Sequence, residues 1–300
     1  MKIAWVFPGQ GSQKLGMGKN VIDLEGAKDK FDFASDIFGK DLFKVCEENQ
    51  DDENREFDLN ATKNTQICLF LVESILLDSL KREGYKPDYL AGHSLGEITA
   101  LYASEVLSFE TCVSLIKFRS YLMSNAPEGS MAALIGFDIE QLQSLIKEID
   151  DVFIANDNSS QQVVLSGTKN ALNQISSKLK CKRYIPLNVS GAFHSDFMRE
   201  PSQKFSAYLD ELVFNDPKYP VISNSNPSFT KNSTELKARL KEQMCNGVRW
   251  REIMDTMFSS SQGNLHFIEV GPSNVLGGLA KRHLKEVKIS QISSSESLFY

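Results

Sequence analysis

The 300-residue sequence lacks the patterns that mark most metal, redox and membrane proteins. It holds only five cysteines and four histidines, with no C-x-x-C and no H-E-x-x-H, so we expect reduced thiols and no metal site. Lys and Arg total 33 against 39 Asp and Glu, a net charge of −6, which argues against a general nucleic-acid binder. The longest apolar stretch, residues 67–80, is too short and too charged to span a membrane, and no signal peptide is recognisable. We therefore expect a cytoplasmic protein.

What is present is an ordinary globular composition, 41% apolar and 24% charged. The chain exceeds the usual single-domain size of about 100–200 residues, so one large α/β domain and two linked domains are both possible. Short apolar runs predict strands at 3–7, 89–91, 220–222 and 265–270. Apolar residues at helical spacing predict helices over 65–80, 98–106, 110–123, 197–211, 233–243 and 250–258. The polar segment 28–57 predicts surface helices and loops.

Residues 131–190 follow a different pattern, with shorter elements in quick succession. The pattern predicts strands at 131–136, 152–155, 162–165 and 183–189, and helices at 138–149 and 170–179. This β-α-β-β-α-β order is typical of the ferredoxin-like fold. We therefore expect an α/β protein in two parts. A small ferredoxin-like subdomain (127–195) would be inserted into a large α/β hydrolase-like subdomain with a parallel sheet (1–126 and 196–300).

The most specific motif is Gly92-His93-Ser94-Leu95-Gly96, which matches G-x-S-x-G. In that motif a serine occupies a tight turn between a strand and a helix, and the glycines remove Cβ groups that would clash. A predicted strand precedes this turn and a helix-forming run follows it. Ser94 is therefore a candidate nucleophile, and the Leu95 N–H is placed to stabilise an oxyanion. A chance glycine-rich turn is the alternative.

A serine nucleophile needs a base, and His194 is the best candidate among the four histidines. It lies in a loop of small residues, which lets an imidazole approach another chain segment closely. His93 adjoins Ser94, but neighbouring side chains around such a turn point in different directions. His266 lies within an apolar strand and His283 at a basic helix end. A lone histidine is more often structural, so that alternative stays open.

Arg119 lies on the apolar face of the predicted helix 110–123. A cation on such a face needs a polar or anionic partner, either a protein carboxylate, which is the commoner case, or an acidic ligand. Two basic runs also occur in this acidic protein. They are Lys178, Lys180, Lys182 and Arg183, and Lys281, Arg282, His283 and Lys285. Each is most often a solvated face, and each could steer a negatively charged partner.

The first predicted strand runs into Gly9-Gln10-Gly11, which suggests a dinucleotide-binding loop. The third glycine of G-x-G-x-x-G would fall at Lys14, so the pattern fails. A glycine turn remains, able to bring backbone N–H groups close to a bound group.

Taken together, these motifs resemble the malonyl-CoA:acyl carrier protein transacylase family and the related acyltransferase domains of polyketide and fatty acid synthases. The matching segments occur in order over nearly the whole chain. They are Phe7–Gln13, Gly92–Glu97, Lys117–Arg119, Asn156–Asn158 with Gln162–Gly167, Ala192–Ser195, Gln243 with Val248–Trp250, and Glu269–Pro272. The loop 224–227 departs from the more apolar stretch of relatives, so we transfer no role to it.

The resemblance implies an S-malonyltransferase that works in two steps. Ser94 would attack the malonyl thioester with His194 as base, while the N–H groups of Gln10 and Leu95 hold the oxyanion. Arg119 would bind the free malonyl carboxylate. Coenzyme A would then leave, and the phosphopantetheine thiol of acyl carrier protein would take the malonyl group for fatty acid synthesis.

The resemblance further implies that a carbonyl near Gln243 orients His194, with His93 and Asn156 as supporting residues. We expect acyl carrier protein and a coenzyme A thioester as partners, no nucleic acid or membrane, no cofactor, and a monomer. A serine hydrolase such as a thioesterase is one alternative, but it has no use for Arg119. A catalytically idle module that docks carrier protein is another, against which Ser94 and His194 together argue.

Overall fold

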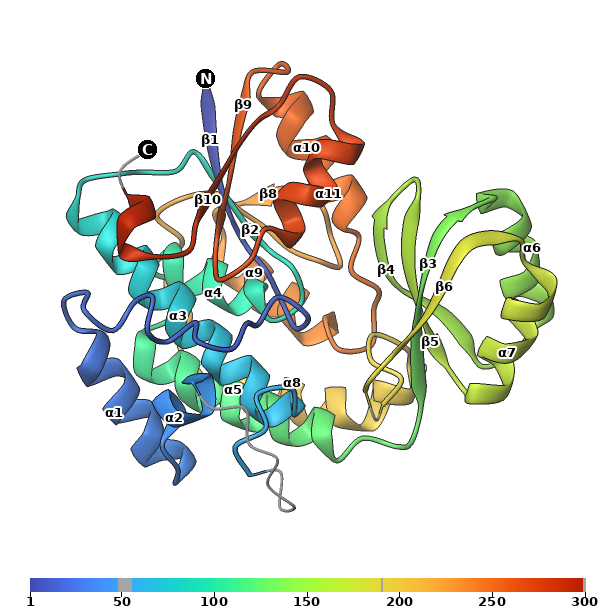
Figure 1. Cartoon of the computed structure of the whole chain (residues 1–300), viewed down its shortest axis with the longest axis horizontal. Coiled ribbons are helices and arrows are strands. Elements are labelled where there is room, and N and C mark those ends of the chain that lie inside the picture. Colours follow the sequence, from blue (N-terminus) through green and yellow to red (C-terminus); the bar gives the residue numbers. More distant parts are fainter. Residues whose placement is uncertain (48–55, 190, 299–300) are drawn as a thin grey trace.

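The computed structural model has a large subdomain and a smaller one beside it, and it describes residues 1–47, 56–189 and 191–298 (Figure 1). Part of the polar segment 28–57 and Ser190, which falls within the predicted bounds 127–195, lie outside the described residues. So does the end of the second part of the large subdomain, 299–300.

The large subdomain is built on a six-stranded sheet of order β10-β9-β1-β2-β7-β8. The strands are β1 (Lys2–Phe7), β2 (Tyr89–Gly92), β7 (Val221–Ile222), β8 (Phe229–Thr230), β9 (Leu265–Val270) and β10 (Lys288–Ile292). All neighbours are parallel except β7 and β8. Because Phe7 pairs with Gly92, the loop after β1 and the turn after β2 lie at the same edge of the sheet.

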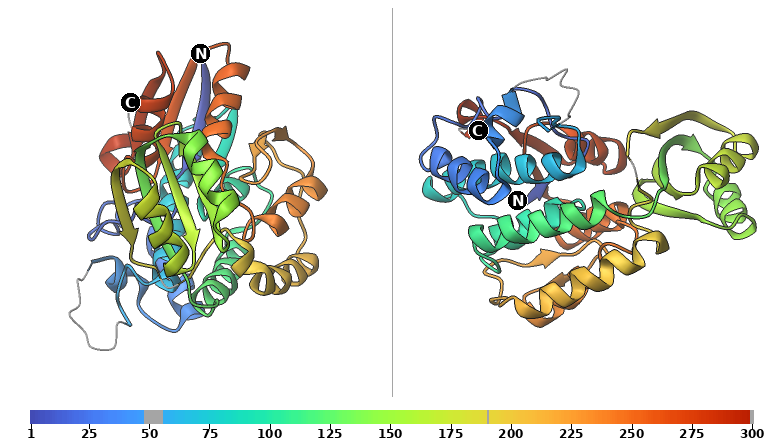
Figure 2. Two further views of the ribbon diagram at one scale, coloured as in Figure 1. Left: turned by 90° about the vertical axis from the view of Figure 1, so that its right-hand side faces the viewer. Right: turned by 90° about the horizontal axis from the view of Figure 1, so that it is seen from below.

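Helices cover both faces of this sheet (Figures 1 and 2). They are α1 (Ala27–Phe38), α2 (Leu42–Glu47), α3 (Thr62–Arg82), α4 (Gly96–Ala103), α5 (Phe109–Ser124), α8 (Arg199–Glu211), α9 (Ser233–Glu242), α10 (Trp250–Ser260) and α11 (Val275–His283), with short 3₁₀ helices η1 (Asp196–Met198) and η2 (Ser295–Leu298). Helix α3 is buried almost all round, which explains its nearly continuous apolar sequence. Among the described helices, none combines the length and apolar character that crossing a membrane requires.

The expectation that 28–57 forms a surface segment is only half right. Helices α1 and α2 each bury one face against the large core, through residues such as Phe31, Ala34 and Val45. The apolar residues are separated by charged ones at helical spacing, so one face is buried while the segment as a whole reads as polar.

The small subdomain is a four-stranded antiparallel sheet of order β4-β5-β3-β6. Its strands are β3 (Ser130–Phe137), β4 (Val152–Ser159), β5 (Gln162–Gly167) and β6 (Cys181–Leu187), and its helices are α6 (Ile139–Glu148) and α7 (Lys169–Lys178). Side chains of Asp138 and Thr168 cap the two helices. Both helices lie on the face of the sheet turned away from the large subdomain (Figure 1) and share a separate apolar core with it. The predicted fold class is thereby confirmed.

Candidate active site

Ser94 stands on a sharp turn between β2 and α4, with a positive φ of 53°. A Cβ added to Gly92 would lie 1.8 Å from the Gly96 carbonyl carbon, and one added to Gly96 would lie 2.0 Å from the Phe7 oxygen. Both are far inside van der Waals contact, so only glycine fits at these two positions. The spacing of glycines in the sequence therefore permits the sharp turn that presents the half-buried Ser94.

The Ser94 hydroxyl is hydrogen-bonded to His194, with 2.8 Å between Oγ and Nε2. On the other side of the ring, Nδ1 lies 2.9 Å from the Gln243 carbonyl oxygen and 3.2 Å from that of Asn246. Because carbonyl oxygens only accept hydrogen bonds, Nδ1 carries the ring proton and Nε2 is free to accept the serine proton. Burial, and secondarily the charge of Arg119, lowers the pKa of His194 to about 3, so the imidazole is neutral near pH 7.

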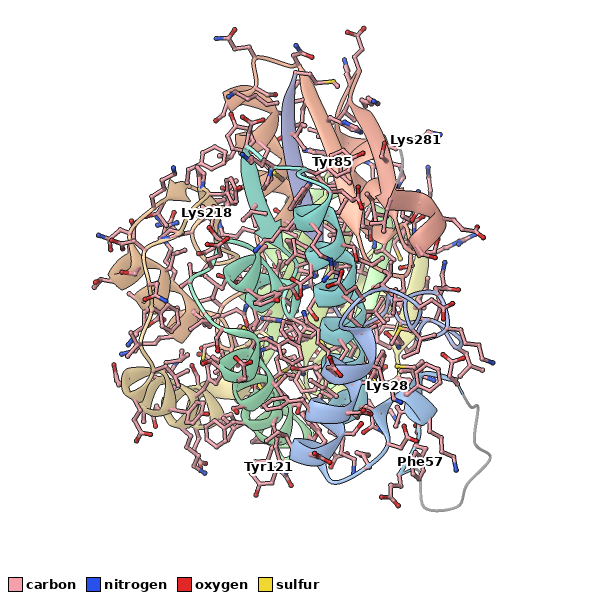
Figure 3. All side chains as sticks on the ribbon, turned by 90° about the vertical axis from the view of Figure 1, so that its left-hand side faces the viewer. Lys28, Phe57, Tyr85, Tyr121, Lys218 and Lys281 are labelled. Atoms are coloured by element: carbon pink, nitrogen blue, oxygen red, sulfur yellow. The ribbon has the colours of Figure 1, made fainter. Side chains whose placement is uncertain are left out.

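Arg119 reaches into the site from α5 and is only 1% exposed. Its Nη2 donates to Ser94 Oγ at 3.1 Å and to Gln243 Oε1 at 2.9 Å, and its Nη1 donates to Gln66 Oε1 at 2.7 Å. Two residues further on, Tyr121 points outward from the same helix and is 60% exposed (Figure 3). The helix thus carries a buried cation on one face and a solvated ring on another.

The partners of Arg119 are two neutral amides and a hydroxyl rather than acids. Within the described parts of the chain, no carboxylate lies within ion-pair distance of its guanidinium. Burial lowers the pKa of Arg119 to about 10, and the nearby charge of Glu97 opposes that shift, so the group stays charged. A buried guanidinium without a direct counter-ion, beside a nucleophile, has the chemistry of a binding site for an acidic ligand.

Gln243 connects these groups through its side chain as well as through its carbonyl, although the resemblance implied only a carbonyl near it. Its side-chain Nε2 donates to the Ser94 carbonyl at 2.9 Å and to Glu97 Oε2 at 2.8 Å. Its Oε1 accepts from Arg119, and its backbone oxygen accepts from His194. Gln243 is fully buried, and this single residue ties the serine and the arginine, through its side chain, and the histidine, through its backbone oxygen, into one network.

The loop after β1 brings the Gln10 amide close to the Ser94 turn. A Cβ on Gly9 would lie 2.5 Å from the His93 oxygen, so this loop can pack on the serine turn only because Gly9 has no side chain. In residues 1–47, 56–189 and 191–298 the backbone N–H groups of Gln10 and Leu95 donate no hydrogen bond. Two unused donors beside a serine are what an oxyanion hole requires.

The His93 ring contacts residues other than Ser94. Its Nε2 lies 2.9 Å from Asn158 Oδ1 on β4, and its ring lies 5.4 Å from that of Trp250. Burial lowers the pKa of His93 as well. The contact with Asn158 links the serine turn to the small subdomain.

A cavity of about 90 Å³ opens at Ser94 between the subdomains. Its walls are Gln10, Gln66, His93, Ser94, Leu95, Arg119, Met123, Met131, Asn156, Leu187, Val189, Phe193 and His194. The structure thus gathers seven of the eight predicted site residues around one cavity, and Gln243 bonds to three of them from behind. A larger hollow of about 670 Å³ lies on the Asp157 side of β4 and includes neither Ser94 nor His194.

Three polar residues at this site were not predicted from the sequence. Gln66 and Glu97 lie on helices, where a lone polar residue is usually on a solvated face, yet both are buried here. Asn224 lies in the loop to which we gave no role, and its side chain contacts the serine turn directly. The only sequence feature that could have pointed to one of them is the position of Glu97, directly after G-x-S-x-G.

A neutral histidine hydrogen-bonded to a serine, with free amides beside it, is the arrangement found in enzymes that form a serine ester. The acyl transferase domain family matches residues 4–298, and the chain belongs to that family. The family resemblance inferred from the motifs is thereby confirmed.

Two relatives within this family share a more specific name. The chain is 46% identical over 298 residues to a malonyl CoA-acyl carrier protein transacylase of Synechocystis sp., covering 99% of both chains. It is 36% identical to the protein of the same name from Bacillus subtilis, covering 99% of this chain and 95% of that one.

Solved structures agree with these sequence matches. The crystal structure of Synechocystis sp. malonyl-CoA:ACP transacylase superimposes with a TM-score of 0.94 at 45% identity, covering 99% of both chains. A malonyl-transacylase solved in complex with its type II polyketide synthase acyl-carrier protein gives a TM-score of 0.91 at 31% identity, covering 99% of this chain and 98% of that one.

Proposed function

We propose that this chain is an acyl-carrier-protein S-malonyltransferase. It transfers the malonyl group of malonyl-CoA to the phosphopantetheine thiol of acyl carrier protein, and so supplies malonyl carrier protein for fatty acid synthesis. The observation that carries the proposal is the buried Arg119 guanidinium, 3.1 Å from the Ser94 hydroxyl. A plain esterase needs no cation there, whereas an acyl group that ends in a carboxylate does. The names of the relatives support the same substrate.

In the first half-reaction, His194 Nε2 takes the Ser94 proton as Oγ attacks the thioester carbonyl carbon. The carbonyl oxygen becomes an oxyanion and accepts hydrogen bonds from the N–H groups of Gln10 and Leu95. When the carbon–sulfur bond breaks, the imidazolium returns its proton to the leaving thiolate of coenzyme A. A malonyl ester on Ser94 remains, with its free carboxylate at Arg119.

In the second half-reaction, the phosphopantetheine thiol gives its proton to His194 and its sulfur attacks the ester carbonyl. The same two amides hold the second oxyanion. The carbon–oxygen bond then breaks, and His194 returns the proton to Ser94. Burial lowers the pKa of His194, so its imidazole is neutral near pH 7 and Nε2 has a free lone pair at the start of each half-reaction. The proposed chemistry uses no metal or cofactor.

The remaining predictions about partners also stand as proposals. We propose that the protein acts as a cytoplasmic monomer, with acyl carrier protein and coenzyme A thioesters as its partners and without a role at nucleic acids or membranes. The related malonyl-transacylase that was solved in complex with its acyl-carrier protein supports the first of these partners.

The proposal is tested by intact-protein mass spectrometry after brief exposure to malonyl-CoA. We expect the wild type to gain one malonyl group and then lose it to added holo carrier protein. Ser94→Ala should gain nothing, because no other activated nucleophile lies at the turn. Ser160→Ala, a change at an exposed serine between β4 and β5, is the matched control and should behave as wild type. Rapid release of free malonate without carrier protein would instead identify a thioesterase.

A further inference from the structure

Asn224 occupies a position that calls for a side chain with both a hydrogen-bond acceptor and a donor. It follows β7, is 1% exposed, and turns toward the serine turn. Its Oδ1 accepts the Ser94 N–H at 2.7 Å, and its Nδ2 donates to the Gly92 carbonyl at 2.5 Å. One amide therefore satisfies a buried donor and a buried acceptor on the two peptide units that flank His93, immediately before the nucleophile.

Asn224 is also joined to the groups behind the turn. Its backbone N–H donates to Glu97 Oε2 at 3.2 Å, and Gln243 Nε2 donates to the same oxygen at 2.8 Å. The backbone oxygen of Gln243 in turn accepts from the His194 ring. The loop after β7 thus belongs to the same hydrogen-bond network as the nucleophile and the base.

This contact decides which amide faces the substrate. The Ser94 N–H is occupied by Asn224, whereas the next N–H along the chain, that of Leu95, donates no hydrogen bond within the described residues. The turn also holds Ser94 at a φ of 53°, a conformation that non-glycine residues avoid, so it needs support from outside itself. Without the Asn224 amide, the two peptide units could rotate, and the serine oxygen and the Leu95 N–H would lose their shared orientation.

We propose that Asn224 is a positioning residue that holds Ser94 and the Leu95 amide in reactive geometry without touching the substrate. The inference rests on the proposed function in one respect, that Ser94 is the nucleophile. It does not depend on which acyl group is transferred.

The first test is Asn224→Ala, compared with Asn226→Ala, which removes an exposed asparagine from the same loop. We expect Asn224→Ala to lower the maximal rate of acylation by malonyl-CoA roughly 10- to 100-fold, because small displacements of reacting groups cost that much. The KM for malonyl-CoA should change less than about threefold, since Arg119 is untouched. The Asn226 variant should match the wild type.

The second test uses Asn224→Asp, which preserves the shape of the side chain. A neutral Asp can accept from Ser94 N–H and donate from its own hydroxyl to the Gly92 carbonyl. An ionised Asp loses that donor and adds a negative charge beside Glu97, the carboxylate that already accepts from the backbone N–H of residue 224. Arg119 and His194 are the other titratable groups in this hydrogen-bond network. The acylation rate of this variant, divided by that of the wild type at each pH, should therefore rise as the pH falls from about 8 to about 6.

A third readout separates this proposal from the proposed function. Both Asn224 variants should react more slowly than wild type with a fluorophosphonate, which needs an activated serine but no malonyl group. Slower labelling would support the role of Asn224 even if the enzyme failed to transfer malonyl groups. The proposal is overturned if the folded Ala variant acylates within about twofold of wild type, or if its KM rises while its rate is unchanged. If the Ala variant does not fold, a flat pH ratio for the Asp variant overturns it.

Discussion

The two subdomains contribute to the site in different ways. In the large one, buried polar groups converge on the nucleophile, and Arg119, Gln243 and Asn224 all bond directly to Ser94. The sheet of the small one, Ser130–Leu187, supplies walls to the cavity, among them Leu187, and the hydrogen bond between Asn158 and His93. The comparison teaches that the nucleophile and the polar groups bonded to it are built into the large subdomain, while the small sheet shapes access to them. His194, the candidate base, comes from the segment between β6 and η1, inside the predicted bounds 127–195.

The same contrast appears in how each subdomain is covered. The large sheet carries helices on both faces, so the groups at its edge are fixed by a continuous core. The small sheet carries both its helices on one face, and its edge strand β6 is largely exposed. Changes in the large subdomain should therefore damage the reaction itself, and changes on β6 should alter encounters with partners.

The largest effect is expected from removing the base. His194→Ala should slow acylation by about 100- to 10,000-fold, the usual contribution of general acid–base catalysis, and should leave folding largely intact. His93→Ala is the matched control, because its ring bonds to Asn158 and not to Ser94. The measurement is the single-turnover acylation rate. A larger loss in the His93 variant would mean that the base is misassigned.

Arg119→Ala should have the next largest effect. Losing a two-pronged, buried ion contact costs about 2–5 kcal/mol, so kcat/KM for malonyl-CoA should fall by roughly two to three orders of magnitude. Acetyl-CoA should be spared or even improved, since its methyl group no longer faces a cation. The ratio of the two kcat/KM values is measured beside a melting curve. An unchanged ratio with a lower Tm would make Arg119 a scaffold residue.

The same variant should also shift the pH profile. The positive charge of Arg119 helps to lower the pKa of His194, because it disfavours a second cation nearby. Removing that charge raises the His194 pKa, so the imidazole becomes protonated, and useless as a base, at a higher pH than in the wild type. The acid limb of kcat/KM for acetyl-CoA should therefore move to higher pH. A limb that stays in place would show that burial alone sets the basicity of His194.

How much of the fold and of the site can be predicted depends on how close together in the sequence the residues that form each feature lie. The serine turn was predictable because two glycines and the serine lie within five residues. The small subdomain was predictable because each of its elements carries its own apolar period. Strands β8 and β10 were not assigned, since the first has two residues and the second is a polar edge strand. Asn224 could not be found, because it meets Ser94 across 130 positions of sequence.

The fold class is confirmed, whereas the subdomain bounds and the residue roles remain predictions. The small sheet runs from Ser130 to Leu187, inside the predicted bounds 127–195, but the placement of those bounds stays a prediction. So do the roles of all eight predicted site residues, whose positions at or behind the cavity are compatible with what the resemblance implies.

The smallest effect is expected on the small subdomain, at the basic run Lys178, Lys180, Lys182 and Arg183. All four side chains are exposed, and they lie at the end of α7 and the start of β6. Strand β6 continues from there to Leu187, at the wall of the cavity. With five residue steps of about 3.3 Å, Lys182 is some 17 Å from that wall, so a carrier protein bound at the run would hold its prosthetic arm close to the cavity.

The resemblance implies an acidic carrier protein, and this enzyme is acidic too, so docking needs a local region of opposite charge. Lys182→Glu with Arg183→Glu should raise the KM for carrier protein about three- to tenfold, because each exposed charge contributes about 0.2–1 kcal/mol. Acylation by malonyl-CoA should be spared, and the effect should shrink at high salt, which screens exposed charges. The control is Lys281→Glu with Lys285→Glu, an equal charge change on the other basic run, at and beyond the end of α11 (Lys281 is labelled in Figure 3). Equal damage to both half-reactions, or an equal effect of the control, would show that carrier protein does not dock along β6.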